Sequence, residues 1–306
     1  MSLKTHRIVV TTRFLLLSLI ISFAACNKSD NPSPKVFSSP EDAGNSLLEA
    51  AKSGDQNAIP AIFGPESKQI ISSGDAVQDK TMVDAFVAGY GVMHRWRRMP
   101  DGAQILLVGA DNFPFPIPLK KNGGGQWFFD TAAGKDEILA RRVGRNELAV
   151  IDVCAALADA EAEYFGSTKQ FALKFISDTG KQNGLYWESA DGQPQSPLGP
   201  LVAFATDEGY RAKPNSHAPF HGYNFHMLTR QGSHAQDGAK DYVVNGKMVG
   251  GFAFVAYPAE YGNSGIMTFI INQDGVLFQK DLGKTTAETA AALAEFDPDP
   301  SWTAVE

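Results

Sequence analysis

Apolar residues recur every three or four positions along several stretches of the chain, the spacing of amphipathic helices. The first helix is predicted to begin at Pro40, with Ser39 as its N-cap and acidic residues in its first turn. The longest helical pattern covers residues 136–165. We expect its buried stripe to contain Ile138, Leu148, Ile151, Ala155, Ala158, Ala162 and Phe165, and we expect Arg141, Arg142, Arg145, Asp152 and Asp159 to face elsewhere.

Shorter helices are predicted at residues 56–63, 80–88 and 286–295. Asp297-Pro298-Asp299-Pro300 ends the last of them, because proline cannot continue a helix. We expect the chain beyond this point to be frayed.

Strand patterns fall into two groups. Strands at 93–98, 104–110, 115–119 and 126–129 form the first group, and strands at 223–228, 252–257, 266–271 and 276–279 form the second. Pro100-Asp101-Gly102 and Asn122-Gly123-Gly124-Gly125 favour hairpin turns. Prolines alternate with apolar residues in Phe113–Pro118, which predicts an edge strand because proline has no N–H to donate.

This order of helices and strands predicts an α+β protein with two domains. The N-terminal domain would cover residues 37–135, as helices followed by an antiparallel sheet. The C-terminal domain would cover residues 136–306, with the long helix packed on a sheet at about 220–281. Residues 180–200 are rich in Gly, Pro, Gln and Ser and are predicted to form a long loop.

The first residues have the pattern of an export signal. Three basic residues, Lys4, Arg7 and Arg13, precede an apolar run at 14–25 that is too short to span a bilayer. Small residues stand before Cys26, as in bacterial lipoproteins. We expect residues 1–25 to be removed, Cys26 to be lipidated and residues 26–36 to form a tether. Cleavage by ordinary signal peptidase, which would leave Cys26 as a free thiol, is the alternative.

The charge balance is acidic. The whole chain has 27 Lys+Arg and 34 Asp+Glu, a net charge of −7, and residues 1–25 hold three of the bases and no acid. The remainder therefore has 24 bases against 34 acids, a net charge of −10. Nucleic acid is excluded as a partner on this basis, and anionic lipid headgroups are poor partners for such a surface.

The sequence gives little support for a metal site or for a catalytic nucleophile. Four histidines, at 217, 221, 226 and 234, lie close together in sequence, but their spacing matches no zinc pattern. Cys154 sits among alanines in the long helix, as expected of a small buried residue. We therefore predict no metal, no cofactor and no catalytic residue.

Three groups of residues are candidates for binding. His221 and Tyr223 belong to a His-Gly-Tyr sequence. Asp241 and Glu260 are candidates to meet, with Asn245 and Asp274, at one end of the second sheet and to hold a cation or polar ligand there. Trp96 and Arg97 belong to a basic cluster that could stack on a planar or anionic ligand, although strand alternation predicts that Trp96 faces the core.

Several motifs resemble one family of exported bacterial proteins, the domain of unknown function 2950. They are residues 113–118 (FPFPIP), 127–134 (WFFDTAAG), 142–147 (RVGRNE), 221–223 (HGY) and 256–262 (AYPAEYG). The resemblance implies an exported protein and carries no activity. The C-terminal half also resembles the globular heads of type II secretion pseudopilins, which implies a helix, a loop and an antiparallel sheet in that order.

Two functional hypotheses remain open. The first is an uncharacterised envelope lipoprotein that binds or scaffolds another envelope protein, anchored to the membrane by its lipid and facing the periplasm. Asn27 after the cysteine favours the outer membrane over the inner. The second is a periplasmic hydrolase with a site between the domains, using His221 with Asp241 or Glu260.

Overall fold

The computed structural model describes residues 33–305 apart from 66, 191, 193 and 212–217. The predicted signal peptide, Cys26 and His217 lie outside the described residues. The residues from Pro32 onward make one unit through their internal contacts. The division between residues 135 and 136 into two domains stays a prediction.

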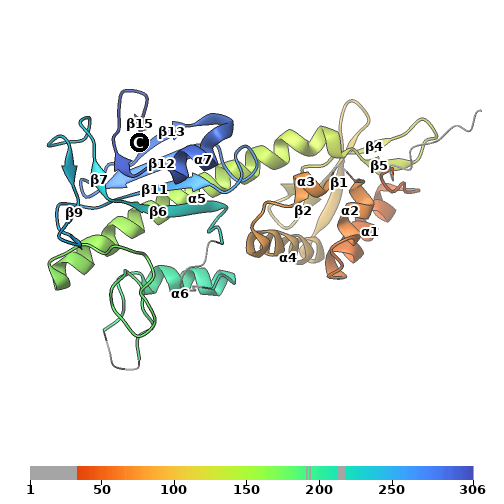
Figure 1. Ribbon diagram of the computed structural model, residues 1–306. Coiled ribbons are helices and arrows are strands. Elements are labelled where there is room, and N and C mark those ends of the chain that lie inside the picture. The colour runs from red at the N-terminus through yellow and green to blue at the C-terminus, as the bar shows by residue number, and fades with distance from the viewer. Residues whose placement is uncertain (1–32, 66, 191, 193, 212–217, 306) are drawn as a thin grey trace, which may run out of the picture. The chain divides into compact units, whose positions relative to one another are not determined.

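Helices open the described part of the chain (Figure 1). The first begins as predicted, because the Ser39 hydroxyl accepts a hydrogen bond from the Asp42 N–H and Pro40 is the first helical residue. The helix predicted at 80–88 is longer than expected. Asp75 is its N-cap, so the helix begins at Ala76, and it continues to Val92. The helices are α1 (Pro40–Lys52), α2 (Ala58–Phe63), α3 (Ser67–Ile71) and α4 (Ala76–Val92).

The first sheet is antiparallel and follows these helices. Prolines interrupt the strand predicted at 115–119, and β4 begins only after Pro118. The short strand β3, just before this stretch, pairs only with β2, at the edge of the sheet. Trp96 packs against the apolar core while Arg97 is exposed, as strand alternation predicts. The strands are β1 (His94–Arg98), β2 (Gln104–Val108), β3 (Phe113–Pro114), β4 (Leu119–Lys121) and β5 (Trp127–Phe129).

The buried face of the long helix α5 (Thr131–Thr168) is not the one predicted from the sequence, so that prediction is wrong. Leu148, predicted to be buried, is 68% exposed. The buried apolar face instead contains Val150, Val153, Cys154, Leu157, Ala160 and Tyr164, spaced by three and four residues. Alanines on several sides of the helix make more than one face look apolar in the sequence. Among the described residues, no helix is long and apolar enough to cross a membrane.

The second sheet is also antiparallel, in the order β15-β13-β12-β11-β6. Helix α5 contacts β12, and α7 contacts β11, whose residues are nearly all buried. Phe254, Phe269 and Tyr223 are among the largest side chains of this core. The strands are β6 (Tyr223–Leu228), β11 (Ala253–Pro258), β12 (Met267–Asn272), β13 (Phe278–Asp281) and β15 (Thr303–Ala304).

The remaining elements are short. The predicted last helix ends early, at Ala291, and the predicted frayed tail is wrong: β15 pairs with β13, and the Val305 N–H donates to the Leu277 carbonyl at 2.9 Å. The protein is therefore a mixed α+β protein with antiparallel sheets. The other elements are α6 (Gly199–Glu208), β7 (Arg230–Gln231), β8 (Lys240–Asp241), β9 (Val243–Val244), β10 (Lys247–Met248), a 3₁₀ turn (Gly283–Thr285), α7 (Thr286–Ala291) and β14 (Glu295–Phe296).

Two glycines of α5 test how tightly its first turns are packed. A Cβ added at Gly134 would lie 2.9 Å from the Ile117 Cα, whereas one added at Gly144 would meet nothing within 4 Å. We expect Gly134→Ala to lower the free energy of unfolding by roughly 1–3 kcal/mol through overpacking. Gly144→Ala should raise it by up to about 1 kcal/mol, because alanine favours the helix. Urea unfolding of both variants checks this, and shifts in the same direction would contradict the packing.

Candidate functional site

Polar side chains from four distant segments meet beside the middle of α5. The segments are the end of α3 with the loop before α4 (Ile70–Asp75), residues 142–147 of α5, the described residues Glu208–Tyr210 and Phe220–Gly222, and the hairpin loop Ala259–Met267 between β11 and β12. We call this region the polar junction. It contains three of the motifs that resemble the exported bacterial family.

Arg142 joins two of these segments and is only 5% exposed. Its guanidinium donates to the main-chain carbonyls of Ile70, Ile71 and Ser72, at 3.1 Å for Ile71 and 3.3 Å for Ser72. It also donates to the side-chain oxygen of Asn263. Burial lowers the pKa of Arg142, while the charge of Asp79 acts to raise it. The sequence prediction that Arg142 faces away from the buried side is therefore wrong.

Asn146 lies one turn further along α5 and holds the hairpin loop. Its amide donates to the Ser264 carbonyl at 2.8 Å. Gly222 packs directly against it: a Cβ at Gly222 would lie 2.6 Å from the Asn146 amide nitrogen, and the backbone there has φ +74°. Both the close approach and the left-handed backbone require glycine at the centre of the His-Gly-Tyr motif.

Glu147, the last residue of the same motif, binds the start of β12. One carboxylate oxygen accepts the N–H groups of Ile266 and Met267, both at 2.9 Å. The N-terminal residue and the last two residues of Arg-Val-Gly-Arg-Asn-Glu thus all bind main-chain or amide groups of other segments. These three side chains of the motif position loops, whereas Arg145 donates to the Gln78 side chain of α4 at 3.4 Å.

Asp75 connects the helix α4 to the segment around His221. One of its carboxylate oxygens accepts the N–H groups of Val77 and Gln78 at 3.1 Å, which caps α4. The other accepts the Tyr210 hydroxyl at 2.6 Å and the Gly222 N–H at 3.3 Å. Asp75 is 3% exposed, so both oxygens are used inside the protein.

Among the candidate residues at the junction, His221 has the side chain best suited to acid–base chemistry. Its Nε2 lies 3.3 Å from a carboxylate oxygen of Glu208, and its ring packs against Phe220 and Tyr210. Its backbone has φ +49°, which is uncommon for a residue other than glycine. Burial lowers the pKa of His221, although Glu208 and Asp75 act to raise it. Burial thus favours the neutral form of the imidazole.

Some of the other predicted site residues lie at the junction, and the others lie elsewhere in the protein. Glu260 belongs to the junction, where its carboxylate accepts the Asn263 amide at 2.8 Å. Tyr223 is fully buried in β6, and its hydroxyl donates to the Met267 carbonyl at 3.0 Å. Asp241 lies in β8 opposite Arg230, in a sheet separate from that of β6, the strand that follows His221. Trp96 and Arg97 lie in β1.

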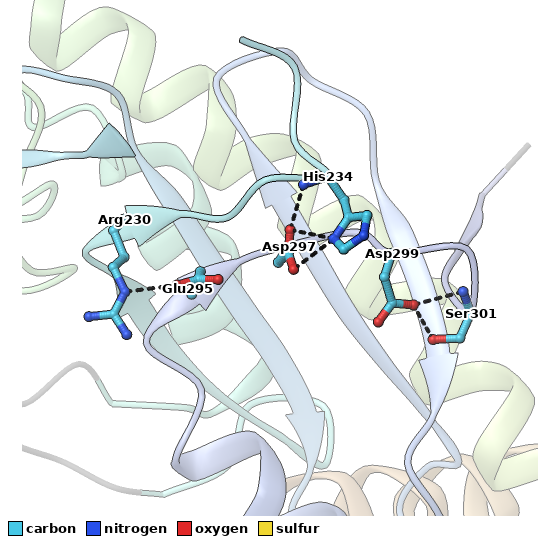
Figure 2. A network of polar contacts seen from close by, with 6 residues as sticks. All are labelled: Arg230, His234, Glu295, Asp297, Asp299 and Ser301. Carbon is cyan, nitrogen blue, oxygen red and sulfur yellow. Dashed lines mark hydrogen bonds and ion pairs between the residues drawn. The ribbon is translucent and has the colours of Figure 1, made fainter. Parts of the chain in front are cut away.

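The described histidines have separate partners. His226 Nε2 lies 2.9 Å from the Leu293 carbonyl. His234 contacts Asp297 near the C-terminus, beside the ion pair of Arg230 with Glu295, as Figure 2 shows. The hydrogen bond and charge of Asp297 raise the pKa of His234. Within the part of the chain that the structure describes, no group of three His, Cys, Asp or Glu residues could hold a metal ion.

Sequence reasoning missed Asp75, Tyr210 and Glu208 as members of this region. Each comes from a loop or a helix end, and only folding brings them to His221. Arg142 and Asn146 had a signal, because they belong to a motif that supported the family resemblance, but the motif alone does not indicate what its side chains bind.

Two further buried groups lie outside the junction. Glu161, on the buried face of α5, accepts the Ala172 N–H at 2.8 Å, and burial raises its pKa to about 8. Cys154 is 1% exposed, and burial raises the pKa of its thiol. Cys154 thus has the surroundings of a core residue, because a reactive thiol needs a lowered pKa and access.

The fold and the junction define a mixed α+β protein in which buried polar side chains tie loops to one long helix. Residues 34–305 match the model of a family described as "Protein of unknown function (DUF2950)". The chain belongs to this family. A search of curated proteins and a search of solved structures each found no match. The resemblance to pseudopilin heads gains no support from these comparisons.

Replacing Arg142 tests whether the junction holds the protein together. We expect Arg142→Met to lower the free energy of unfolding by on the order of 3 kcal/mol, because buried carbonyls lose their donors. Arg230→Met is the matched control, since Arg230 is a half-exposed guanidinium paired with Glu295, and it should cost less than about 1 kcal/mol. Equal losses in urea unfolding would show that Arg142 has no special role.

Proposed function

We propose that this protein is a lipid-anchored component of the bacterial cell envelope that binds or scaffolds another envelope protein and catalyses no reaction. The sequence around Cys26 supports export and lipidation. The family supports an exported protein through the resemblance of its motifs. The tether at residues 26–36 would hold the folded part near one leaflet, facing the periplasm, and Asn27 favours the outer membrane.

The main support for this proposal is the hydrogen bonding of Arg142. Its donors go to carbonyls of Ile70, Ile71 and Ser72 and to Asn263, and Asn146 and Glu147 likewise bind the main chain of other segments. A catalytic group must present an atom to the substrate within hydrogen-bonding reach. Side chains whose polar atoms are engaged with the protein's own backbone are suited to keeping loops in place. The motif then maintains a rigid platform, and recognition belongs to the surface.

The two domains predicted from the sequence form part of this proposal. The first sheet with α1 to α4 and the second sheet with α7 each have their own apolar core. Helix α5 contacts α3 in the first group and β12 in the second. A scaffold built in this way would offer a binding surface on each group of elements.

The anchor is tested by the two cysteines of the chain, Cys26 and Cys154. We expect Cys26→Ser to release the protein from the membrane fraction, because the acyl chains attach to that sulfur. Cys154→Ser is the control and should stay in the membrane fraction, since Cys154 is buried in α5. Mass spectrometry of the N-terminal peptide should find Cys26 with a lipid mass. An unmodified thiol at Cys26 would overturn the anchor.

A hydrolase is the second candidate, and the pair of His221 and Glu208 favours it. A carboxylate beside an imidazole can orient it as a general base, and His221 has the lowered pKa of a neutral base. This pair replaces the pairs with Asp241 or Glu260 that the sequence suggested. A carboxylate at 3.3 Å is also a common structural partner for a half-buried histidine.

His221→Asn separates the two candidates. Asparagine tolerates the left-handed backbone at this position but cannot act as a base. Under the binding function, we expect the variant to fold and to recover the same envelope partners as the wild type after crosslinking in intact cells. His234→Asn, at an exposed histidine, is the control. Recovery of no partner by the wild-type protein, or loss of a hydrolytic activity in His221→Asn alone, would favour the hydrolase.

A further inference from the structure

A pocket of about 420 Å³ lies at the end of the first sheet, between residues of β4 and β5 and the turn that joins β1 to β2. Arg98, Gln104, Lys120, Lys121 and Trp127 line it, together with Asp101 in the turn. We call it the Trp127 pocket. Its residues come from neighbouring strands: Arg98 pairs with Gln104 across β1 and β2, and Lys121 pairs with Trp127 across β4 and β5.

The lining of this pocket is basic although the protein is acidic. Three cationic side chains line it against one carboxylate, that of Asp101. An Asp101 oxygen already accepts the Ala103 N–H at 3.0 Å, and Lys120 has a partner in Asp130 at 3.0 Å. Arg98 and Lys121 form no ion pair with any described residue. Their two charges are available to an anion from outside the chain.

Trp127 gives the pocket an aromatic wall beside these charges. The Lys121 ammonium lies 5.0 Å from the centre of the indole ring, within the range of a cation–π contact. Tryptophan is amphipathic, and its side chain is favoured where an apolar region meets polar headgroups. The combination of an indole with an arginine and lysines therefore fits a phosphate that is attached to an apolar body.

An apolar pocket of about 320 Å³ adjoins the first one. Met99, Ile105 and Pro118 line it. The two pockets share Asp101, Ala103 and Lys120, but Gln104 of the first and Ile105 of the second are consecutive residues of β2, whose side chains point to opposite faces of the sheet. A ligand with an anionic group at Arg98 and Lys121 and an apolar part against Trp127 would match the first pocket. This is the chemistry of an anionic lipid.

The chain enters the fold beside the Trp127 pocket. Phe37 and Trp127 exchange main-chain hydrogen bonds of 2.8 and 2.9 Å, and the Lys35 ammonium lies over the Phe37 ring. Cys26 is eleven residues before Phe37, which is at most about 40 Å of extended chain. A lipid on Cys26 would thus keep this end of the first sheet close to the membrane surface.

We propose that the Trp127 pocket binds the phosphate of an anionic lipid in the leaflet that holds the anchor, with the indole of Trp127 against the apolar part next to the headgroup. The chemistry of the site stands on the described residues, and its orientation toward the membrane rests on the proposed lipid anchor. The net charge of the chain argued against such headgroups as partners. Headgroup attraction is local, however, because it falls off within a Debye length of about 8 Å at physiological salt.

Vesicle binding tests the pocket without the anchor. Residues 27–306 should bind vesicles of phosphatidylcholine and phosphatidylglycerol mixed at about two to one, and should not bind vesicles of phosphatidylcholine alone. Arg98→Glu with Lys121→Glu should weaken this binding at least about tenfold. The control is Lys247→Glu with Lys284→Glu, which changes the net charge equally at two exposed lysines of the C-terminal half. An equal loss in the control, or no vesicle binding by the wild type, would overturn the proposal.

A second measurement separates a membrane lipid from a free phosphate compound. Inorganic phosphate is titrated into the same chain while tryptophan fluorescence is followed, with Trp127→Phe to identify the signal of the pocket. Phosphate binding together with vesicle binding supports the lipid. Phosphate binding without vesicle binding would contradict a lipid as the occupant. These assays use a chain without the lipid anchor. If Cys26 proved to be unmodified, the proposed lipoprotein function would fail, but the results of these assays would not change.

Discussion

The buried guanidinium of Arg142 is the constraint on which the junction depends. Removing a charge from water costs several kcal/mol unless hydrogen bonds replace the lost hydration. Here the carbonyls of Ile70, Ile71 and Ser72 and the amide of Asn263 provide them. Helix α5, about 57 Å long by its 38 residues, therefore cannot rotate or slide by one position without leaving this charge unpaired. One side chain fixes the register of a long helix against two loops.

Local signals in the sequence predicted much of the fold. The cap of α1 at Ser39, the turn at Pro100-Asp101-Gly102 and the strands of both antiparallel sheets depend on residues that are neighbours in the chain. The buried face of α5 was predicted wrongly because its many alanines leave helical spacing ambiguous. The burial of Arg142 has no local signal either, since its main-chain acceptors lie about seventy residues away in the chain and Asn263 lies 121 residues away.

The candidate site was predicted in the same uneven way. His221 and Glu260 were found because unusual residue types stand out in a sequence, whereas Glu208 and Asp75 look like an ordinary helix end and an ordinary N-cap. Gly222 joins two of the segments: its N–H donates to Asp75, and its missing side chain leaves room for Asn146. A site made by one glycine between two polar neighbours depends on distances that only the folded chain defines.

The distribution of charge shows why total charge is a weak guide to partners. The chain beyond residue 25 has ten more acids than bases, yet Arg98, Lys120 and Lys121 gather around one indole. Screening confines a surface's influence to roughly one Debye length, so a charged partner responds to the few side chains nearest to it. The pairing of Phe37 with Trp127 ties the start of the folded chain to these bases. If the pocket binds an anionic lipid as proposed, the acidic remainder would act against adsorption by other faces, and the charge imbalance would favour a single orientation at the membrane surface.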